Sequence, residues 1–178
     1  MKKWILVASL VLLIGIVLVL PFKPVFSFEE TRTEKGHMFY IPFDRNQPTF
    51  QFIYTHSIHL SDVVESYEVT KDYQIRSLAM EYEDVAIGMP GYAEEGQTLT
   101  ILESGHYYLT FEQLVMPSFT MHLSDIISKQ TFMYEGQLYD LKKILPKGSS
   151  YLFSVKKISI FQWWKGGYYK YDKQSDTN

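Results

Sequence analysis

Short runs in which apolar and polar residues alternate dominate most of this 178-residue chain. Such alternation predicts β-strands, because successive side chains of a strand point to opposite faces of a sheet. No long window outside the N-terminus has a helical period, although residues 140–145 are expected to form one helical turn before a proline. The predicted strands are residues 37–42, 49–58, 63–70, 73–83, 98–103, 106–112, 118–124, 131–134, 137–141 and 150–161.

Glycine, proline and asparagine fall between these runs, where tight reversals of the chain need them. Glu135-Gly136, for example, is placed as the two-residue turn of a hairpin. The length suits one domain, and a hydrophobic content of 46% excludes wholesale disorder. We therefore expect an all-β fold, either an antiparallel β-sandwich or a partly open barrel.

The N-terminus differs from the rest, because the segment from Trp4 to Leu20 carries no charge and follows Lys2 and Lys3. As a helix this segment would be about 26 Å long, the lower limit for crossing a bilayer. The two lysines would stay in the cytoplasm and the chain after Pro21 would lie outside. We favour an uncleaved transmembrane anchor over a cleaved signal peptide, because residues 25–27 fit the small-residue cleavage rule only weakly.

Four segments follow from this pattern. Residues 1–27 are the membrane anchor or signal segment, 28–36 a polar linker, 37–162 the extracytoplasmic β-domain, and 163–178 a basic aromatic tail. Charge is also distributed unevenly along the chain. Residues 28–140 have a net charge of −12 and residues 141–178 of +6, although the whole chain totals only −3.

Composition also excludes several classes of function. The absence of cysteine rules out a disulfide framework, a zinc ribbon and a thiol nucleophile. The mildly acidic balance argues against a nucleic-acid partner. We find no His-x-His or His-Glu-x-x-His spacing and predict neither a metal nor a cofactor.

The tail is rich in the residue types that settle at a membrane–water interface. We place five of its residues there as interface candidates. The alternative is an edge hairpin that turns at Gly166-Gly167 and packs its aromatic side chains on the sandwich. The five candidates are Trp163, Trp164, Lys165, Tyr168 and Tyr169.

The densest polar cluster runs from Tyr54 to Asp62 and contains adjacent His56 and Ser57. Neighbours on a strand face opposite ways, so His56 cannot deprotonate Ser57 directly, and no Gly-x-Ser-x-Gly elbow is present. We prefer a structural histidine and name no catalytic residue. The alternative is an extracytoplasmic hydrolase or metal-dependent enzyme that uses this region with His59 and Glu65.

The segment Phe52-Ile53-Tyr54-Thr55-His56-Ser57-Ile58, followed by Val63-Val64-Glu65, resembles the domain of unknown function 1850 family. Two further blocks carry the resemblance, Ala86 to Pro90 and Leu138 to Leu141 with Pro146 and Gly148. Coverage would be about residues 37–160. The chain departs from the family pattern at Ser61-Asp62, where the family often has Thr-Pro, and at Ala86, where it has glycine.

The resemblance implies a small extracytoplasmic accessory protein, encoded beside TRAP transporters of the TAXI type and without an established catalytic activity. It also implies a shared site in which His56 and Glu65 face each other across a hairpin. We therefore expect a membrane-tethered binding protein that assists such a transporter. Its candidate ligand- or partner-binding residues are Tyr54, His56, Ser57, Glu65, Gly88 and Pro90.

Overall fold

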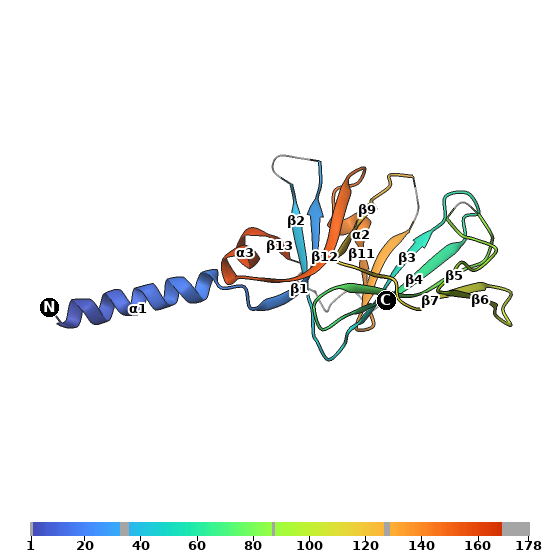
Figure 1. Ribbon diagram of the computed structural model, residues 1–178. Coiled ribbons are helices and arrows are strands. Elements are labelled where there is room, and N and C mark those ends of the chain that lie inside the picture. The colour runs from blue at the N-terminus through green and yellow to red at the C-terminus, as the bar shows by residue number, and fades with distance from the viewer. Residues whose placement is uncertain (1, 33–35, 87, 127–128, 169–178) are drawn as a thin grey trace.

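The computed structural model describes residues 2–32, 36–86, 88–126 and 129–168. A helix, α1 (Lys2–Val19), extends away from a β-domain that contains the rest of the described chain (Figure 1). The N-terminal helix of our prediction is therefore present, and its apolar side chains are exposed along nearly its whole length. Among the described residues, no helix combines the length and the apolar character needed to cross a membrane.

Two sheets form the β-domain, and all but one of their strand pairs are antiparallel. The first sheet has the order β13-β2-β1-β12-β9. It consists of β1 (Lys23–Glu30), β2 (Met38–Pro42), β9 (Ser118–His122), β12 (Ser150–Ile158) and β13 (Gly167–Tyr168), the last of which runs parallel to β2.

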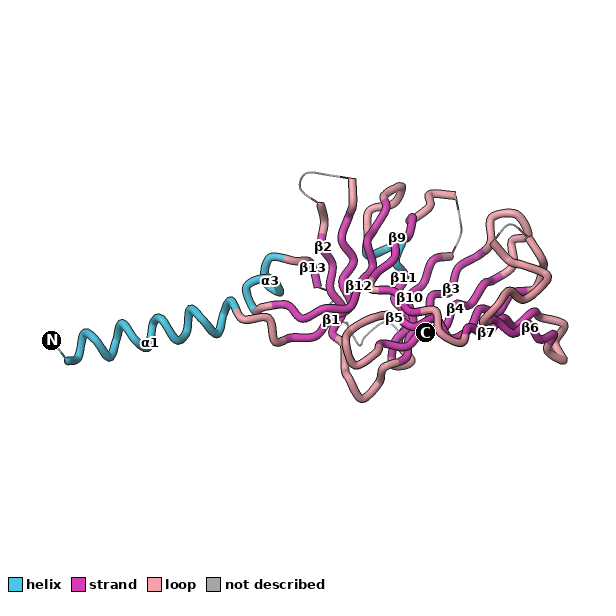
Figure 2. The backbone as a smooth tube through the Cα atoms, viewed as in Figure 1, coloured by secondary structure: helices cyan, strands magenta, loops and turns pink. Residues whose placement is uncertain are grey.

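The second sheet has the order β11-β10-β3-β4-β5-β7-β6, with the short β8 beside β5. The prediction of an antiparallel all-β fold is thus confirmed, and the sheets do not close into a barrel (Figure 2). Its strands are β3 (Thr49–Thr55), β4 (Asp62–Val69), β5 (Ile75–Tyr82), β6 (Gln97–Ile101), β7 (Tyr107–Phe111), β8 (Val115–Met116), β10 (Gln130–Tyr134) and β11 (Gln137–Asp140).

The turn from β10 to β11 is the expected two-residue hairpin. Glu135 and Gly136 both have positive φ, 52° and 73°, the backbone that a tight hairpin turn of this handedness needs. The expected helical turn follows as α2 (Leu141–Ile144). The Asp140 carboxylate caps it by accepting a hydrogen bond from the backbone N–H of Lys142.

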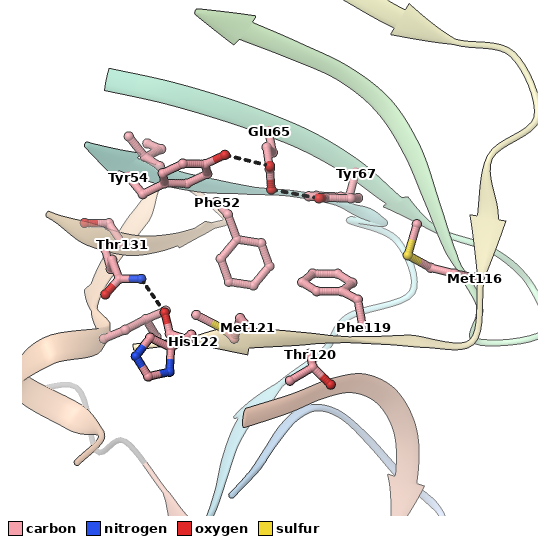
Figure 3. A pocket seen from close by; sticks show the side chains of 13 residues that line it. Phe52, Tyr54, Glu65, Tyr67, Met116, Phe119, Thr120, Met121, His122 and Thr131 are labelled. Atoms are coloured by element: carbon pink, nitrogen blue, oxygen red, sulfur yellow. Dashed lines mark hydrogen bonds between the residues drawn. The ribbon is translucent and has the colours of Figure 1, made fainter. Parts of the chain in front are cut away.

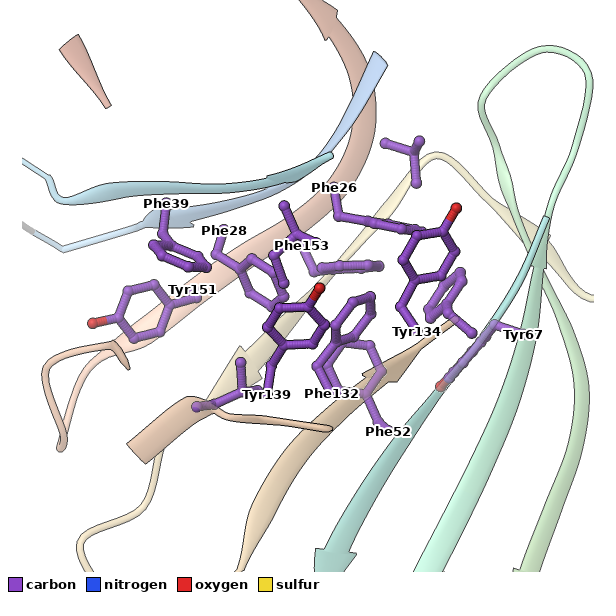
Figure 4. Packing of buried hydrophobic residues seen from close by; sticks show 14 of the residues in the cluster. Phe26, Phe28, Phe39, Phe52, Tyr67, Phe132, Tyr134, Tyr139, Tyr151 and Phe153 are labelled. Carbon is purple, nitrogen blue, oxygen red and sulfur yellow. The ribbon is translucent and has the colours of Figure 1, made fainter. Parts of the chain in front are cut away.

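An aromatic core joins the two sheets (Figure 4). Phe26 on β1 is one of its fully buried members. The Phe26 ring lies 4.8–5.9 Å, centroid to centroid, from five other rings, most of them in the edge-to-face geometry that aromatic quadrupoles favour. These five rings belong to Phe43, Phe50, Phe132, Tyr134 and Phe153, so both sheets contribute.

The position of β1 corrects our segment boundaries. Residues 23–27 were assigned to the anchor and 28–30 to a polar linker, yet all of them form the middle strand of the first sheet, paired with β2 and β12. Both faces of β1 are covered, since Phe26 and Phe28 face the core while Val25 and Ser27 are buried on the other side. A strand that is buried on both faces has a continuous apolar sequence without alternation. In this chain that sequence comes directly after the apolar N-terminal segment, so the two were not separated.

The alternative for the tail, an edge hairpin that turns at Gly166-Gly167, is wrong, because the described residues before that turn, Trp163–Lys165, belong to a helix, α3 (Ile160–Lys165). A capping box starts α3. The Ser159 hydroxyl accepts from the Gln162 backbone N–H, and the Gln162 side chain accepts from the N–H of Ser159. Gly166 ends the helix so close to the Tyr40 ring that a β-carbon there would overlap it.

Candidate ligand-binding pocket between the sheets

A cavity of about 420 Å³ opens between the two sheets, where β9 lies opposite β3 and β4 (Figure 3). Its walls are mostly apolar, and they include one carboxylate. The residues that line it are Phe52, Ile53, Tyr54, Glu65, Tyr67, Met116, Phe119, Thr120, Met121, His122, Gln130, Thr131 and Leu141.

Pro117 explains how the chain builds the β9 wall. Residues 115–116 pair with β5 in the second sheet, whereas residues 118–122 pair with β12 in the first. The chain thus changes sheets at a residue that has no backbone N–H to give to either ladder. This crossing brings Phe119 and Met121 over the inner face of the second sheet, where Phe119 packs against Phe52 with ring centroids 5.6 Å apart.

Glu65 is the carboxylate in the opposite wall, and two tyrosines hold it. The Tyr54 hydroxyl donates to Glu65 Oε1 at 3.0 Å, and the Tyr67 hydroxyl donates to Oε2 at 2.8 Å (Figure 3). The strand register brings Glu65 and the two tyrosines together. Glu65 lies opposite Phe52 and Tyr54 lies opposite Val63 in the β3–β4 pair, while Val63, Glu65 and Tyr67 share one face of β4. A charged side chain therefore occupies a position on the core-facing side of the sheet.

Burial dominates the electrostatics of this group. It raises the pKa of Glu65 above the ordinary carboxyl value of 4.5, while the hydrogen bonds from Tyr67 and Tyr54 act in the opposite direction. The pKa of each tyrosine is also raised, first by burial and then by the nearby Glu65 charge. Both phenols consequently remain protonated donors at physiological pH.

Replacing Glu65 with glutamine is expected to change how stability depends on pH. Since the folded pKa lies above 4.5, the folded state holds a proton that the unfolded chain has lost, and stability falls as pH rises through the folded pKa. The slope of this loss is at most about 1.4 kcal/mol per pH unit. Urea unfolding from pH 4 to 8 should show that Glu65→Gln lacks this loss.

Glu68→Gln is the matched control, because Glu68 lies on the same strand and forms an exposed ion pair with Arg76 at 2.9 Å. It should keep the wild-type loss of stability with rising pH. Equal pH profiles for Glu65→Gln and the wild type would contradict the raised pKa.

Of the predicted site residues, Tyr54 and Glu65 meet in this pocket, whereas His56 and Ser57 lie outside its lining. The expectation that His56 faces Glu65 is wrong, since β3 ends at Thr55 and His56 begins the following turn. His56 Nδ1 accepts a hydrogen bond from the Ile58 backbone N–H at 3.4 Å, and its ring stacks on His59 at 5.7 Å. Ser57 is exposed in this turn.

Gly88 and Pro90 lie in the loop after β5, also outside the pocket lining. Gly88 has a positive φ of 84°, and the Pro90 carbonyl accepts a hydrogen bond from the Tyr82 hydroxyl. This loop meets the His56 turn, because His59 Nδ1 lies 3.6 Å from an Asp84 carboxylate oxygen. Within the described residues, no group of three or more His, Cys, Asp or Glu side chains is arranged to hold a metal ion.

The membrane-interface candidates separate into two groups. Trp163 packs into the domain, with its ring 6.4 Å from Tyr40 and Lys23 Nζ 3.5 Å from its centroid. Trp164 and Lys165 are exposed, and Trp164 keeps 72% of its surface accessible. Tyr168 lies in β13, and Tyr169 falls outside the described residues.

Sequence reasoning missed the other residues of the pocket. Tyr67 could have been found, because it stands two positions after Glu65 and shares its face of the strand. The opposite wall consists of Met116 on β8 and of Phe119, Met121 and His122 on β9. Nothing in the local sequence of these strands indicates which strand they face.

Comparison with known proteins gives one family. The family model described as "Domain of unknown function (DUF1850)" matches residues 50–141, which include the β3–β4 wall of the pocket and the β9 wall. No curated protein and no solved structure matches the chain.

Proposed function

The chain belongs to the DUF1850 family, and we propose that it is a binding protein that holds a small, largely apolar molecule between its two sheets. The observation that carries this proposal is the hydrogen-bonded carboxylate of Glu65 in the wall of an otherwise mostly apolar cavity. Ligand pockets commonly combine an apolar lining with a few oriented polar groups that fix the ligand. The size of the cavity is also within the usual range for small-molecule sites.

Direct titration tests this proposal. We expect naphthalen-1-ylmethanol, a neutral aromatic alcohol, to bind saturably and with one-to-one stoichiometry by calorimetry. Met116→Trp should weaken this binding at least tenfold, because the larger side chain occupies part of the cavity that Met116 lines. Val115→Trp is the matched control, since Val115 is the neighbouring residue and is exposed outside the cavity.

Two results would contradict a ligand-binding pocket. One is equal affinity of the wild type and Met116→Trp. The other is that the wild type binds neither this alcohol nor the amine or the carboxylate built on the same naphthalene ring.

We further propose that the N-terminal segment holds the domain at a membrane, with the domain outside the cytoplasm. The exposed apolar surface of α1 supports this, because a large contiguous apolar surface on a protein marks an interaction site. Next to the end of α1, which contacts α3, exposed Phe22, Phe161 and Trp164 lie with Lys165, the residue types of a membrane–water interface. Lys2 and Lys3 before the apolar segment support the orientation.

The embedding of β1 in the fold supports a retained anchor over a signal peptide cleaved at Ser27. Such cleavage would remove Lys23 to Ser27, which pair with β12 in the middle of the first sheet. Any processing that spares the fold would have to occur before β1.

A transporter partner is the most specific part of the proposal. We propose that the domain assists a TRAP-type transporter of the TAXI class, and the resemblance set out under Sequence analysis is what supports it. Co-purification of transporter subunits from gently solubilised membranes tests this partner. The alternative of a hydrolase or metal-dependent enzyme at His56 and Ser57 stays a prediction, to be tested by a His56→Ala activity screen.

A further inference from the structure

We propose that the pocket between the sheets selects a cation, namely an ammonium group carried on an apolar body, with the Glu65 carboxylate as its counter-charge. This inference rests on the proposed ligand-binding function and specifies the chemical class of the ligand.

The first argument is the charge of the pocket wall. Its described lining contains one carboxylate and neither lysine nor arginine. Glu65 has two phenol partners, which are neutral donors, and none of the ion pairs in the described structure involves it. A partly buried carboxylate without an opposite charge is costly, and an ammonium group bound beside it would reduce that cost.

The second argument is the hydrogen-bonding capacity that remains at Glu65. Each carboxylate oxygen has about two acceptor positions, and each already accepts one tyrosine hydroxyl. An ionised carboxylate has no proton to donate. The unused positions on the Glu65 oxygens can therefore be filled only by hydrogen-bond donors of a ligand. Figure 3 shows the carboxylate between the two phenols at the edge of the cavity. An ammonium group supplies both donors and positive charge.

The third argument is the aromatic surroundings. Phe119 lies 5.6 Å from Phe52 and 5.5 Å from Tyr67, ring centroid to ring centroid, so three rings gather beside the carboxylate. Aromatic faces attract cations through their quadrupole, and cages of such rings are a known means of recognising ammonium groups. Met116 and Met121 complete an adaptable apolar wall for the body of the ligand.

The surroundings also disfavour the other charge types. An anion would be repelled by Glu65 and by the net charge of −12 between residues 28 and 140. A neutral alcohol could donate one hydrogen bond to Glu65 but would leave its charge unbalanced. Apart from Glu65, Tyr54 and Tyr67, the one titratable side chain in the described lining is the exposed His122, whose Nδ1 is paired with the Ser150 hydroxyl at 3.2 Å.

Three probes with one carbon skeleton and different charge test the inference. They are naphthalen-1-ylmethylamine, which is a cation at pH 7.5, the neutral naphthalen-1-ylmethanol and the anionic 1-naphthoate. Calorimetry with the full chain in detergent at pH 7.5 should show the amine binding at least tenfold more tightly than the alcohol, and the naphthoate binding least. In Glu65→Gln the amine should lose its advantage, whereas Glu68→Gln, on the opposite face of β4, should retain it.

A fold check accompanies the variants, because Glu65→Gln must unfold cooperatively for its affinities to count. Glu65→Asp, which keeps the charge, is the second variant and should retain a preference for the amine. Equal or tighter binding of the alcohol to the wild type would overturn the cation preference and leave the ligand-binding function intact. Failure of all three probes to bind would instead overturn the proposed function itself.

Discussion

A chain that begins at Phe28 is expected not to fold, whereas a chain that begins at Phe22 should keep the whole β-domain. The first truncation removes Lys23 to Ser27, so β2 and β12 each lose their pairing with β1 along more than half of their length. It also deletes the fully buried Phe26 from the aromatic core. Because a folded domain is typically stable by only about 5–15 kcal/mol, the combined loss of strand pairing and of a buried aromatic ring is expected to unfold it. The second truncation removes only residues 1–21, namely Met1, α1 and the two residues that follow it.

Circular dichroism and urea unfolding measure both results. The chain from Phe28 should give no cooperative transition, and the chain from Phe22 should unfold with nearly the midpoint of the full chain. Vesicle flotation measures membrane association separately. The chain that begins at Phe22 should largely lose the membrane association of the full chain. A cooperative transition for the chain from Phe28 would refute the structural role of β1 and restore a signal peptide that ends at Ser27.

Phe26→Ala is expected to be among the most destabilising single substitutions in the domain. The ring is fully buried and lies within 6 Å, centroid to centroid, of five others from both sheets. Its removal forfeits the transfer free energy of a phenyl group and leaves a cavity that rigid neighbouring strands cannot fill. The typical cost is about 3–5 kcal/mol in the free energy of unfolding.

Phe22→Ala is the control, because Phe22 precedes β1 by one residue and remains 53% exposed. This variant should change the free energy of unfolding by no more than about 0.5 kcal/mol. Urea unfolding of the chain that begins at Phe22, with and without each substitution, gives both values. Similar losses for the two variants would show that Phe26 does not join the sheets as the structure describes.

The sequence predicted the strands well where alternation was clear. The runs that became β2 to β7 and β9 to β12 stood out because one face of each is polar or half-exposed. The strand β1 was missed for a physical reason, since Val25, Phe26, Ser27 and Phe28 are all buried and produce no alternation. Because β1 follows directly after an aliphatic segment, its apolar residues cannot be distinguished by composition from the end of a membrane anchor.

The candidate site was predictable in part. Tyr54 and Glu65 were among the residues named in advance, and their contact follows from the hairpin register. The β9 wall was not predictable from local sequence, because it depends on Pro117 carrying the chain from one sheet to the other. Contacts between sheets are set by tertiary packing, and no periodicity within β9 encodes which strand it will face.

The short connection between α1 and β1 has a mechanical consequence. Only residues 20–22 separate the end of the helix at Val19 from the start of the strand at Lys23. Three residues reach about 10 Å at full extension. The domain therefore has almost no slack and cannot swing freely. A pull on the helix would be transmitted to β1, and the hydrogen bonds of β1 to both neighbouring strands would share it.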